Sequence, residues 1–164
     1  MSGPVHLAKR FFGSLSPRPL DPVDDVWVRE VLGSGERALW ERMPLADRKH
    51  AARVAREVDR LLGGADRPVL AAALLHDVGK IESGLGTFGR VVATAVGAAA
   101  GRDRAHDWGR IGTYLRHPQI GEALLRDAGA DDLTATWARE HHQPPRCWTM
   151  PADVGTALSS ADDD

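Results

Sequence analysis

The chain has 164 residues, of which 43% are hydrophobic and 27% are charged, and its formal net charge is -2. This length and composition are typical of one globular domain with a single core. The small net charge gives no basic field that would attract a nucleic-acid polymer. The single cysteine, Cys147, excludes an internal disulfide and a multi-thiolate metal site, so we expect a reducing, cytoplasmic location.

The N-terminal segment, residues 1–22, is basic and contains two adjacent phenylalanines. It lacks the unbroken apolar stretch of a signal peptide. We interpret it as an arm whose short amphipathic helix packs on the domain, and a membrane contact is the less favoured alternative. The domain itself is expected to span residues 23–164, with no internal boundary.

Helix signals dominate these residues, and strand signals are scarce. Capping side chains, prolines and glycines mark the ends of the helices. Trp27 and Trp40 are expected in the core. The pattern predicts an all-α fold, a single-domain helical bundle. The expected helices cover residues 22–31, 34–41, 45–62, 67–79, 107–116, 118–127, 133–142 and 151 to the end.

Residues 84–101 contain two patterns that we interpret as structural. Residues 84–89, GLGTFG, have the spacing of a dinucleotide-binding turn, but that turn requires a preceding strand. A helix end and a polar loop precede it here, so a flexible loop is the better interpretation. Residues 91–101, VVATAVGAAAG, are far shorter than the roughly 20 residues of a membrane span. We predict a closely packed helix there.

The chain has seven histidines, and most of them lie at particular positions of the predicted helices. His50 lies on the apolar face of its predicted helix, one turn before Val54. Asp77 ends an otherwise apolar helix, where an unpaired carboxylate would cost several kcal/mol or become protonated. Each histidine alone has an ordinary interpretation as a core or capping residue. Five of them lie where a predicted helix faces inward or ends: His50, His76, His117, His141 and His142.

The last predicted helix adds a second inward carboxylate. Val154, Leu158 and Asp162 lie one turn apart on one face, so the apolar stripe ends in an acid. Asp163 or Asp164 would take this position if the helix were distorted. Two carboxylates and five imidazoles directed at one interior require cations or dense hydrogen bonding. We expect bound metal, and neutral imidazole with carboxylate suits Mn, Fe, Zn or Ni.

These residues resemble the HD superfamily of metal-dependent phosphohydrolases, whose signature is a histidine, a histidine-aspartate doublet and a distant aspartate on an all-helical core. The matching positions are His50, His76, Asp77 and Asp162. The segments RHPQIG and REHHQPP, which lie between the doublet and the last aspartate, are similar to the branch that binds two metals. The resemblance covers residues 44–164.

The resemblance implies two divalent metal ions, of Fe, Mn, Zn or Ni, that share Asp77. One ion would be held by His50, His76, Asp77 and Asp162, and the other by Asp77, His117, His141 and His142. It also implies catalytic roles for Asp77, as the bridging ligand, and for Lys80, as a contact to substrate phosphate. A solvated helix end is the ordinary alternative for Lys80. Arg53 is either a further phosphate contact or part of a salt bridge.

Two departures from the family pattern narrow these expectations. Residues 143–151, QPPRCWTMP, stand where members that hydrolyse cyclic-di-GMP have a Gly-Tyr-Pro stretch, so that substrate is unsupported. Ala46 stands where some members have a glutamate for a third metal, so two metals are the expected maximum.

The resemblance therefore implies a metal-dependent phosphohydrolase. It would cleave a phosphoester or phosphoanhydride bond of a small phosphorylated substrate, a nucleotide, by a hydroxide that two metals activate. A nucleic-acid polymer and a membrane are not expected partners. The alternatives are a non-catalytic regulator that binds metal and nucleotide, and a di-iron oxygenase with the same ligands. The pattern leaves the substrate, the metal and the oligomeric state open.

Overall fold

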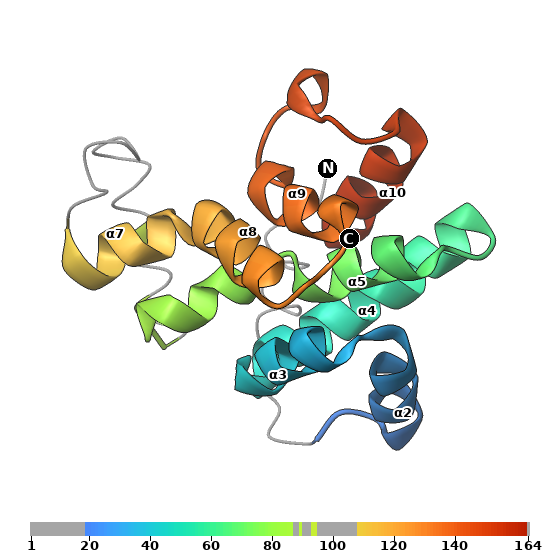
Figure 1. The fold of residues 1–164 in the computed structure, drawn as a ribbon, viewed down its shortest axis with the longest axis horizontal. Coiled ribbons are helices and arrows are strands. Elements are labelled where there is room, and N and C mark those ends of the chain that lie inside the picture. Colours follow the sequence, from blue (N-terminus) through green and yellow to red (C-terminus); the bar gives the residue numbers. More distant parts are fainter. Residues whose placement is uncertain (1–18, 87–88, 90–92, 95–107, 164) are drawn as a thin grey trace, which may run out of the picture.

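The computed structural model describes residues 19–86, 89, 93–94 and 108–163, and in this part the predicted all-α fold is confirmed, with no strand (Figure 1). The first 18 residues of the predicted arm and most of the predicted helix over 91–101 lie outside the described residues. The helices of the described part are α2 (Pro22–Val31), α3 (Ser34–Arg42), α4 (Leu45–Leu62), α5 (Arg67–Leu75), the 3-10 helix η1 (Val78–Ser83), α7 (Gly109–Leu115), α8 (His117–Asp127), α9 (Asp132–Glu140), the 3-10 helix η2 (Pro145–Cys147) and α10 (Ala152–Asp163).

Local capping explains several of these bounds. The side chain of Asp21 accepts a hydrogen bond of 2.9 Å from the backbone N–H of Val23 and so starts α2. Gly63 ends α4 with a φ of 65°, a left-handed conformation that favours glycine. Gly33 is the N-cap of α3, and its N–H donates to the Glu36 carboxylate at 2.7 Å.

The central element is α5, which carries no polar side chain between Val69 and Leu75, and every residue of that stretch is buried. A helix that is apolar on all sides has to be covered on all sides. The helices α2, α3, α4 and α9 pack around it. The C-terminal end of α5 therefore delivers His76 and Asp77 into the interior of the bundle.

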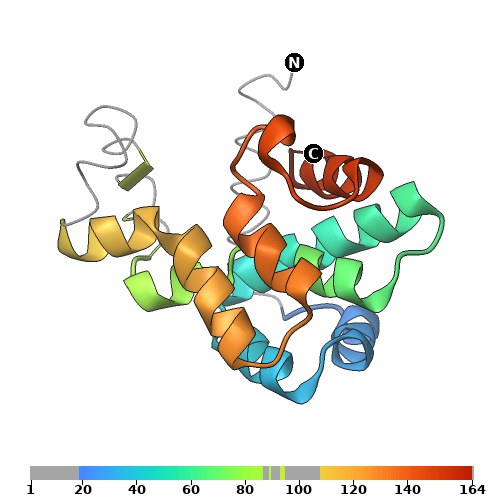
Figure 2. The ribbon, with the colours of Figure 1, turned by 45° about the horizontal axis from the view of Figure 1, so that its top comes forward.

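The other helices bring the remaining histidine-bearing segments to the same place. The long helix α4 packs against both α5 and α10. The helix α8 packs against α9 and η1, and α7 also contacts η1, as the two ribbon views show (Figures 1 and 2). Segments far apart in sequence thus meet around the end of α5. None of the described helices combines the length and apolar character needed to cross a membrane.

The predicted extension of α5 to Gly79 is wrong, because the α-helix ends at Leu75 and a 3-10 helix follows. The ring of His76 bonds to the carbonyl of Ala73 at 2.9 Å, and Asp77 leaves the helical conformation at φ -98° and ψ 6°. Gly79 then lies against α8, where an added Cβ would be 2.0 Å from the carbonyl oxygen of His117. This close approach requires glycine.

The prediction for the two early tryptophans is half confirmed. Trp40 is 3% exposed and belongs to the core. Trp27 is only partly buried and packs against the core from outside, with the guanidinium of Arg56 3.7 Å from its ring centroid. The stacked arginine supplies the packing that a core position would otherwise give.

Candidate metal centre

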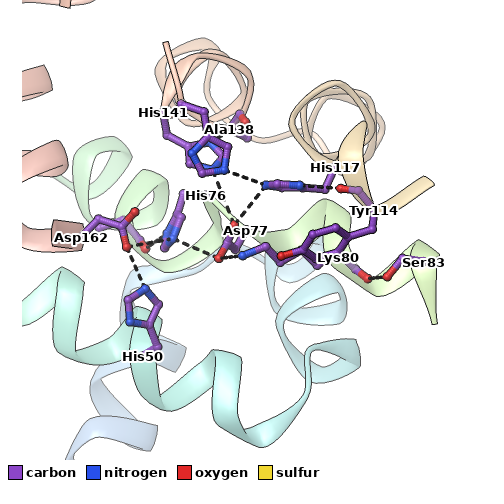
Figure 3. Close-up of polar contacts among 12 residues, drawn as sticks. His50, His76, Asp77, Lys80, Ser83, Tyr114, His117, Ala138, His141 and Asp162 are labelled. Carbon is purple, nitrogen blue, oxygen red and sulfur yellow. Dashed lines mark hydrogen bonds and ion pairs between the residues drawn. The ribbon is translucent and has the colours of Figure 1, made fainter. Parts of the chain in front are cut away.

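All seven side chains predicted as metal ligands converge at the C-terminal end of α5. Figure 3 labels all of them except His142. Ligand atoms of the first set lie within 4.8 Å of one another, and we call this set the three-histidine group: Asp77, His117, His141 and His142. Ligand atoms of His50, His76 and Asp77 also lie within 4.8 Å of one another. With Asp162, whose Oδ1 is 2.8 Å from Nε2 of His50 and 3.6 Å from Nε2 of His76, they form the mixed group.

Asp77 lies between the two groups. Its Oδ2 is 3.5 Å from Nε2 of His76, whereas its Oδ1 is 3.4 Å from Nε2 of His117 and 3.5 Å from Nε2 of His141. These separations are long for hydrogen bonds. Two ligand atoms that are each about 2.1 Å from one ion and about 110° apart are about 3.4 Å from each other. The spacing around Asp77 therefore fits atoms that share a cation.

Three of the imidazoles are fixed by the same local device. Each lies just beyond a helix, where the last carbonyls have no partner within the helix, and each ring donates Nδ1–H to the carbonyl three residues earlier. In the neutral ring, this bond places the proton on Nδ1 and leaves the lone pair of Nε2 directed at Asp77. The pairs are His76 with Ala73 at 2.9 Å, His117 with Tyr114 at 2.7 Å and His141 with Ala138 at 2.9 Å.

Three buried atoms at the centre of the cluster have no hydrogen-bond partner: Nε2 of His76, Oδ1 of Asp77 and Nε2 of His141. Such an atom costs about 1–3 kcal/mol when it is left unsatisfied. Oδ1 of Asp77 and Nε2 of the neutral form of each ring offer lone pairs, so a hydrogen-bond donor shared among them or a cation would satisfy them. Their convergence favours the cation. This buried histidine-aspartate group can therefore hold a metal ion.

His50 differs from these three rings because it lies in the middle of α4. Its Nε2 faces Oδ1 of Asp162 at 2.8 Å, and its Nδ1 accepts a hydrogen bond of 3.3 Å from the guanidinium of Arg53. Since the guanidinium can only donate, the proton of the neutral His50 ring is on Nε2 in this arrangement. A metal bound at Nε2 would replace that proton.

The charges of the cluster are strongly coupled. Burial by itself would raise the pKa of Asp77, but Lys80 and His76 outweigh it and hold the pKa of this carboxyl well below its usual value. Burial disfavours the charged form of His76, yet the Asp77 and Asp162 carboxylates prevail and raise the pKa of His76 to about 9. At neutral pH the metal-free cluster therefore contains an imidazolium, and a metal that binds His76 displaces a proton.

His142 is held in the opposite state. His142 is an exposed residue, yet the desolvation of its ring by the surrounding protein, followed by the neighbouring rings of His141 and His117, lowers the pKa of His142 to about 3. Its Nε2 lies 3.2 Å from Nε2 of His117. A neutral ring with an available lone pair is the form that binds a metal.

Lys80 lies inside the cluster rather than in solvent. The 3-10 helix η1 turns its side chain back so that the ammonium forms an ion pair with Asp77, and 16% of the side chain is exposed. The ammonium also lies 5.9 Å from the ring centroid of Tyr114. The interpretation of Lys80 as a solvated helix end is therefore wrong.

Sequence reasoning missed two residues that shape this centre. Gly79 permits the contact between η1 and α8, and its position next to Lys80 was the available signal. Glu140 is 2% exposed and accepts a hydrogen bond of 2.8 Å from the backbone N–H of Thr149. Its spacing of three residues from the buried Trp137 places it on the inward face of α9 and could have identified it.

The residues of the cluster themselves indicate which metals it could bind. Imidazole and carboxylate ligands suit Mn, Fe, Zn and Ni, and the only cysteine of the chain, Cys147, is exposed and outside the cluster. No protein-family model, no curated protein and no solved structure matches this chain.

Proposed function

We propose that this chain is a metal-dependent phosphohydrolase of the HD type that holds two divalent ions, one in each group, with Asp77 shared between them. The observation that carries the proposal is the position of Asp77: its Oδ1 faces His117 and His141, and its Oδ2 faces His76. A carboxylate whose two oxygens face imidazoles of different groups is suited to bridge two ions.

Two ions held in this way, of Fe, Mn, Zn or Ni, would supply a water of lowered pKa and positive charge for the oxygens of a phosphoryl group. The protein residues have separate tasks. Asp77 keeps the two groups at a fixed separation. The rings of His76, His117 and His141 keep their orientation through the helix-end carbonyls, so they do not have to be ordered when the ions bind.

Lys80 supplies a fixed positive charge beside the shared carboxylate. Burial disfavours its charged form, but Asp77 outweighs burial and raises the pKa of Lys80, so the ammonium stays protonated. A charge that is already oriented and partly shielded from water stabilises the negative charge that develops on a phosphoryl group. We propose a small phosphorylated substrate, a nucleotide, whose phosphate contacts Lys80.

The test combines metal content and turnover. Protein purified without a histidine tag is analysed for bound transition metals by mass spectrometry, and hydrolysis of bis(p-nitrophenyl) phosphate is measured with Mn, Fe, Zn and Ni. We expect bound metal and metal-dependent hydrolysis, and D77N should lose both. D153N is the matched control, because Asp153 is an exposed aspartate in the first turn of α10.

Other outcomes would contradict a hydrolase. Bound metal and bound nucleotide without hydrolysis under any of the four ions would identify a regulator. Oxygen consumption by the iron-loaded protein, without phosphate release, would identify an oxygenase. Protein that takes up none of the four metals would refute the metal centre itself.

A further inference from the structure

We infer that Glu140 is a positioning residue of the metal centre. By binding Thr149 it holds in place the turn over residues 141–149, which carries His142. We call this contact between Glu140 and Thr149 the clip. The inference rests on the proposed metal-dependent function, because it assigns the clip to the three-histidine group. Glu140 is the last residue of α9, and the turn begins directly after it. The clip does not touch the predicted ligands, so its effect on the metal is indirect.

The contacts of Glu140 explain why a carboxylate is stable at a position that is only 2% exposed. Thr149 donates its backbone N–H to Oε2 at 2.8 Å and its hydroxyl to Oε1 at 3.1 Å. The guanidinium of Arg139 donates to Oε1 at 3.0 Å and also pairs with Glu122 of α8 at 3.2 Å. A buried carboxylate without such partners would be strongly destabilising.

The segment between the two ends of the clip is fastened to both neighbouring helices. The backbone N–H of Gln143 donates to the carbonyl of Glu140 at 2.7 Å. The backbone carbonyl of Gln143 accepts a hydrogen bond of 3.1 Å from the indole N–H of Trp148. The ring of Trp148 packs edge-on against Trp137 of α9, with a centroid distance of 5.5 Å. It also lies so close to Gly155 of α10 that an added Cβ there would be 2.5 Å from the ring. The contacts of Gln143 and Trp148 therefore hold the turn against α9 and α10.

His142 depends on this turn more than its neighbour does. The ring of His141 is fixed by the carbonyl of Ala138, whereas within the described residues the ring of His142 bonds to no carbonyl. His142 is placed by its backbone and by the rings of His117 and His141, which are 5.2 and 3.9 Å away between centroids. Loosening the clip should therefore move His142 first.

The experiment uses E140Q and T149V in the full-length chain. In the metal-free protein, we expect both substitutions to accelerate amide hydrogen exchange over residues 141–149. In a Co²⁺ titration followed by visible absorption, E140Q should weaken binding to the three-histidine group about tenfold, and T149V about threefold, because partners outside the ligand set tune metal affinity. T149S keeps both donors and should restore the wild-type affinity.

T134V is the matched control for lost stability. Thr134 lies on the same helix and donates its buried hydroxyl to the carbonyl of Pro68 at 3.0 Å, away from the clip. T134V should lower the unfolding temperature and leave Co²⁺ affinity and exchange over 141–149 unchanged. If E140Q and T149V behave as T134V does, the clip is merely structural and the inference is overturned. Failure of the metal centre gives a different result, since the wild-type chain would then bind no Co²⁺ at all. Failure of the hydrolase function alone would appear as bound metal without hydrolysis and would leave these Co²⁺ affinities unchanged.

Discussion

The two ligand groups are built in different ways. In the three-histidine group, His117 and His141 each follow a helix end that supplies a free carbonyl for the ring. In the mixed group, only His76 has such an anchor. His50 lies mid-helix, where the backbone carbonyls are already used, and its ring is held by Asp162 and Arg53. Helix ends thus orient a ligand locally, whereas a mid-helix ligand depends on tertiary contacts.

This difference predicts an order of metal binding. Ligands that already have the correct tautomer and orientation lose less entropy on binding and therefore bind more tightly. We expect the three-histidine group to take up the first equivalent of Co²⁺ and the mixed group the second. The following substitutions test this difference between the two groups.

The largest effect is expected from H117A. The substitution removes a proposed ligand that faces both Oδ1 of Asp77 and Nε2 of His142. Metal affinity of the three-histidine group should fall by more than about 100-fold, since even partners outside a ligand set contribute tenfold or more. A Co²⁺ titration measures this loss. Uptake of the first equivalent with unchanged affinity would show that the mixed group is the tighter one.

H50A should have a smaller and more selective effect. The substitution removes the ring that faces Asp162 from the mixed group. Binding of the second Co²⁺ should weaken by about 30-fold, and binding of the first should stay unchanged. The measurement is the same titration, with metal content after dialysis as a check. Equal weakening of both binding steps would mean that the two groups are not independent.

The fold was largely predictable because its helix boundaries are encoded locally. Asp21 and Gly63 cap α2 and α4 at the helix ends that the sequence predicts, and the apolar run from Val69 to Leu75 marks a central helix. The end of α5 was missed because a side chain decides it. The His76 ring takes the Ala73 carbonyl, a competition that propensity and periodicity do not register.

The convergence of the site was also predictable, but its second layer of contacts was not. The apolar stripe of the last helix correctly places Asp162 toward the interior, at 2.8 Å from His50. The contact between Glu140 and Thr149 joins residues on two sides of an irregular segment. Periodicity carries no information about such a segment, and its path is set by the packing of Trp148 on Trp137 and α10.

K80M tests the positive charge of Lys80, which lies beside Asp77, the residue common to both groups. The substitution keeps the length of the side chain and removes the ammonium that pairs with Asp77. We expect kcat/KM for bis(p-nitrophenyl) phosphate to fall about tenfold, because a positive charge near the reacting phosphoryl group is lost. Binding of both Co²⁺ equivalents should persist. K80R, which keeps the charge, should retain more activity than K80M, and equal losses would argue against a charge effect.

R53M should produce the smallest effect, and in the opposite direction. Arg53 donates to Nδ1 of His50 at 3.3 Å and thereby favours the tautomer with the proton on Nε2, the atom that faces Asp162. Metal binding at Nε2 requires the other tautomer. Removing the guanidinium should strengthen binding of the second Co²⁺ about threefold, without changing the first. The matched control is R56M on the same helix, because Arg56 stacks on Trp27 instead and should leave both binding steps unchanged. Weaker binding in R53M would show that Arg53 supports His50 as a ligand, and the mixed group would then be better organised than the contrast with the helix-end histidines implies.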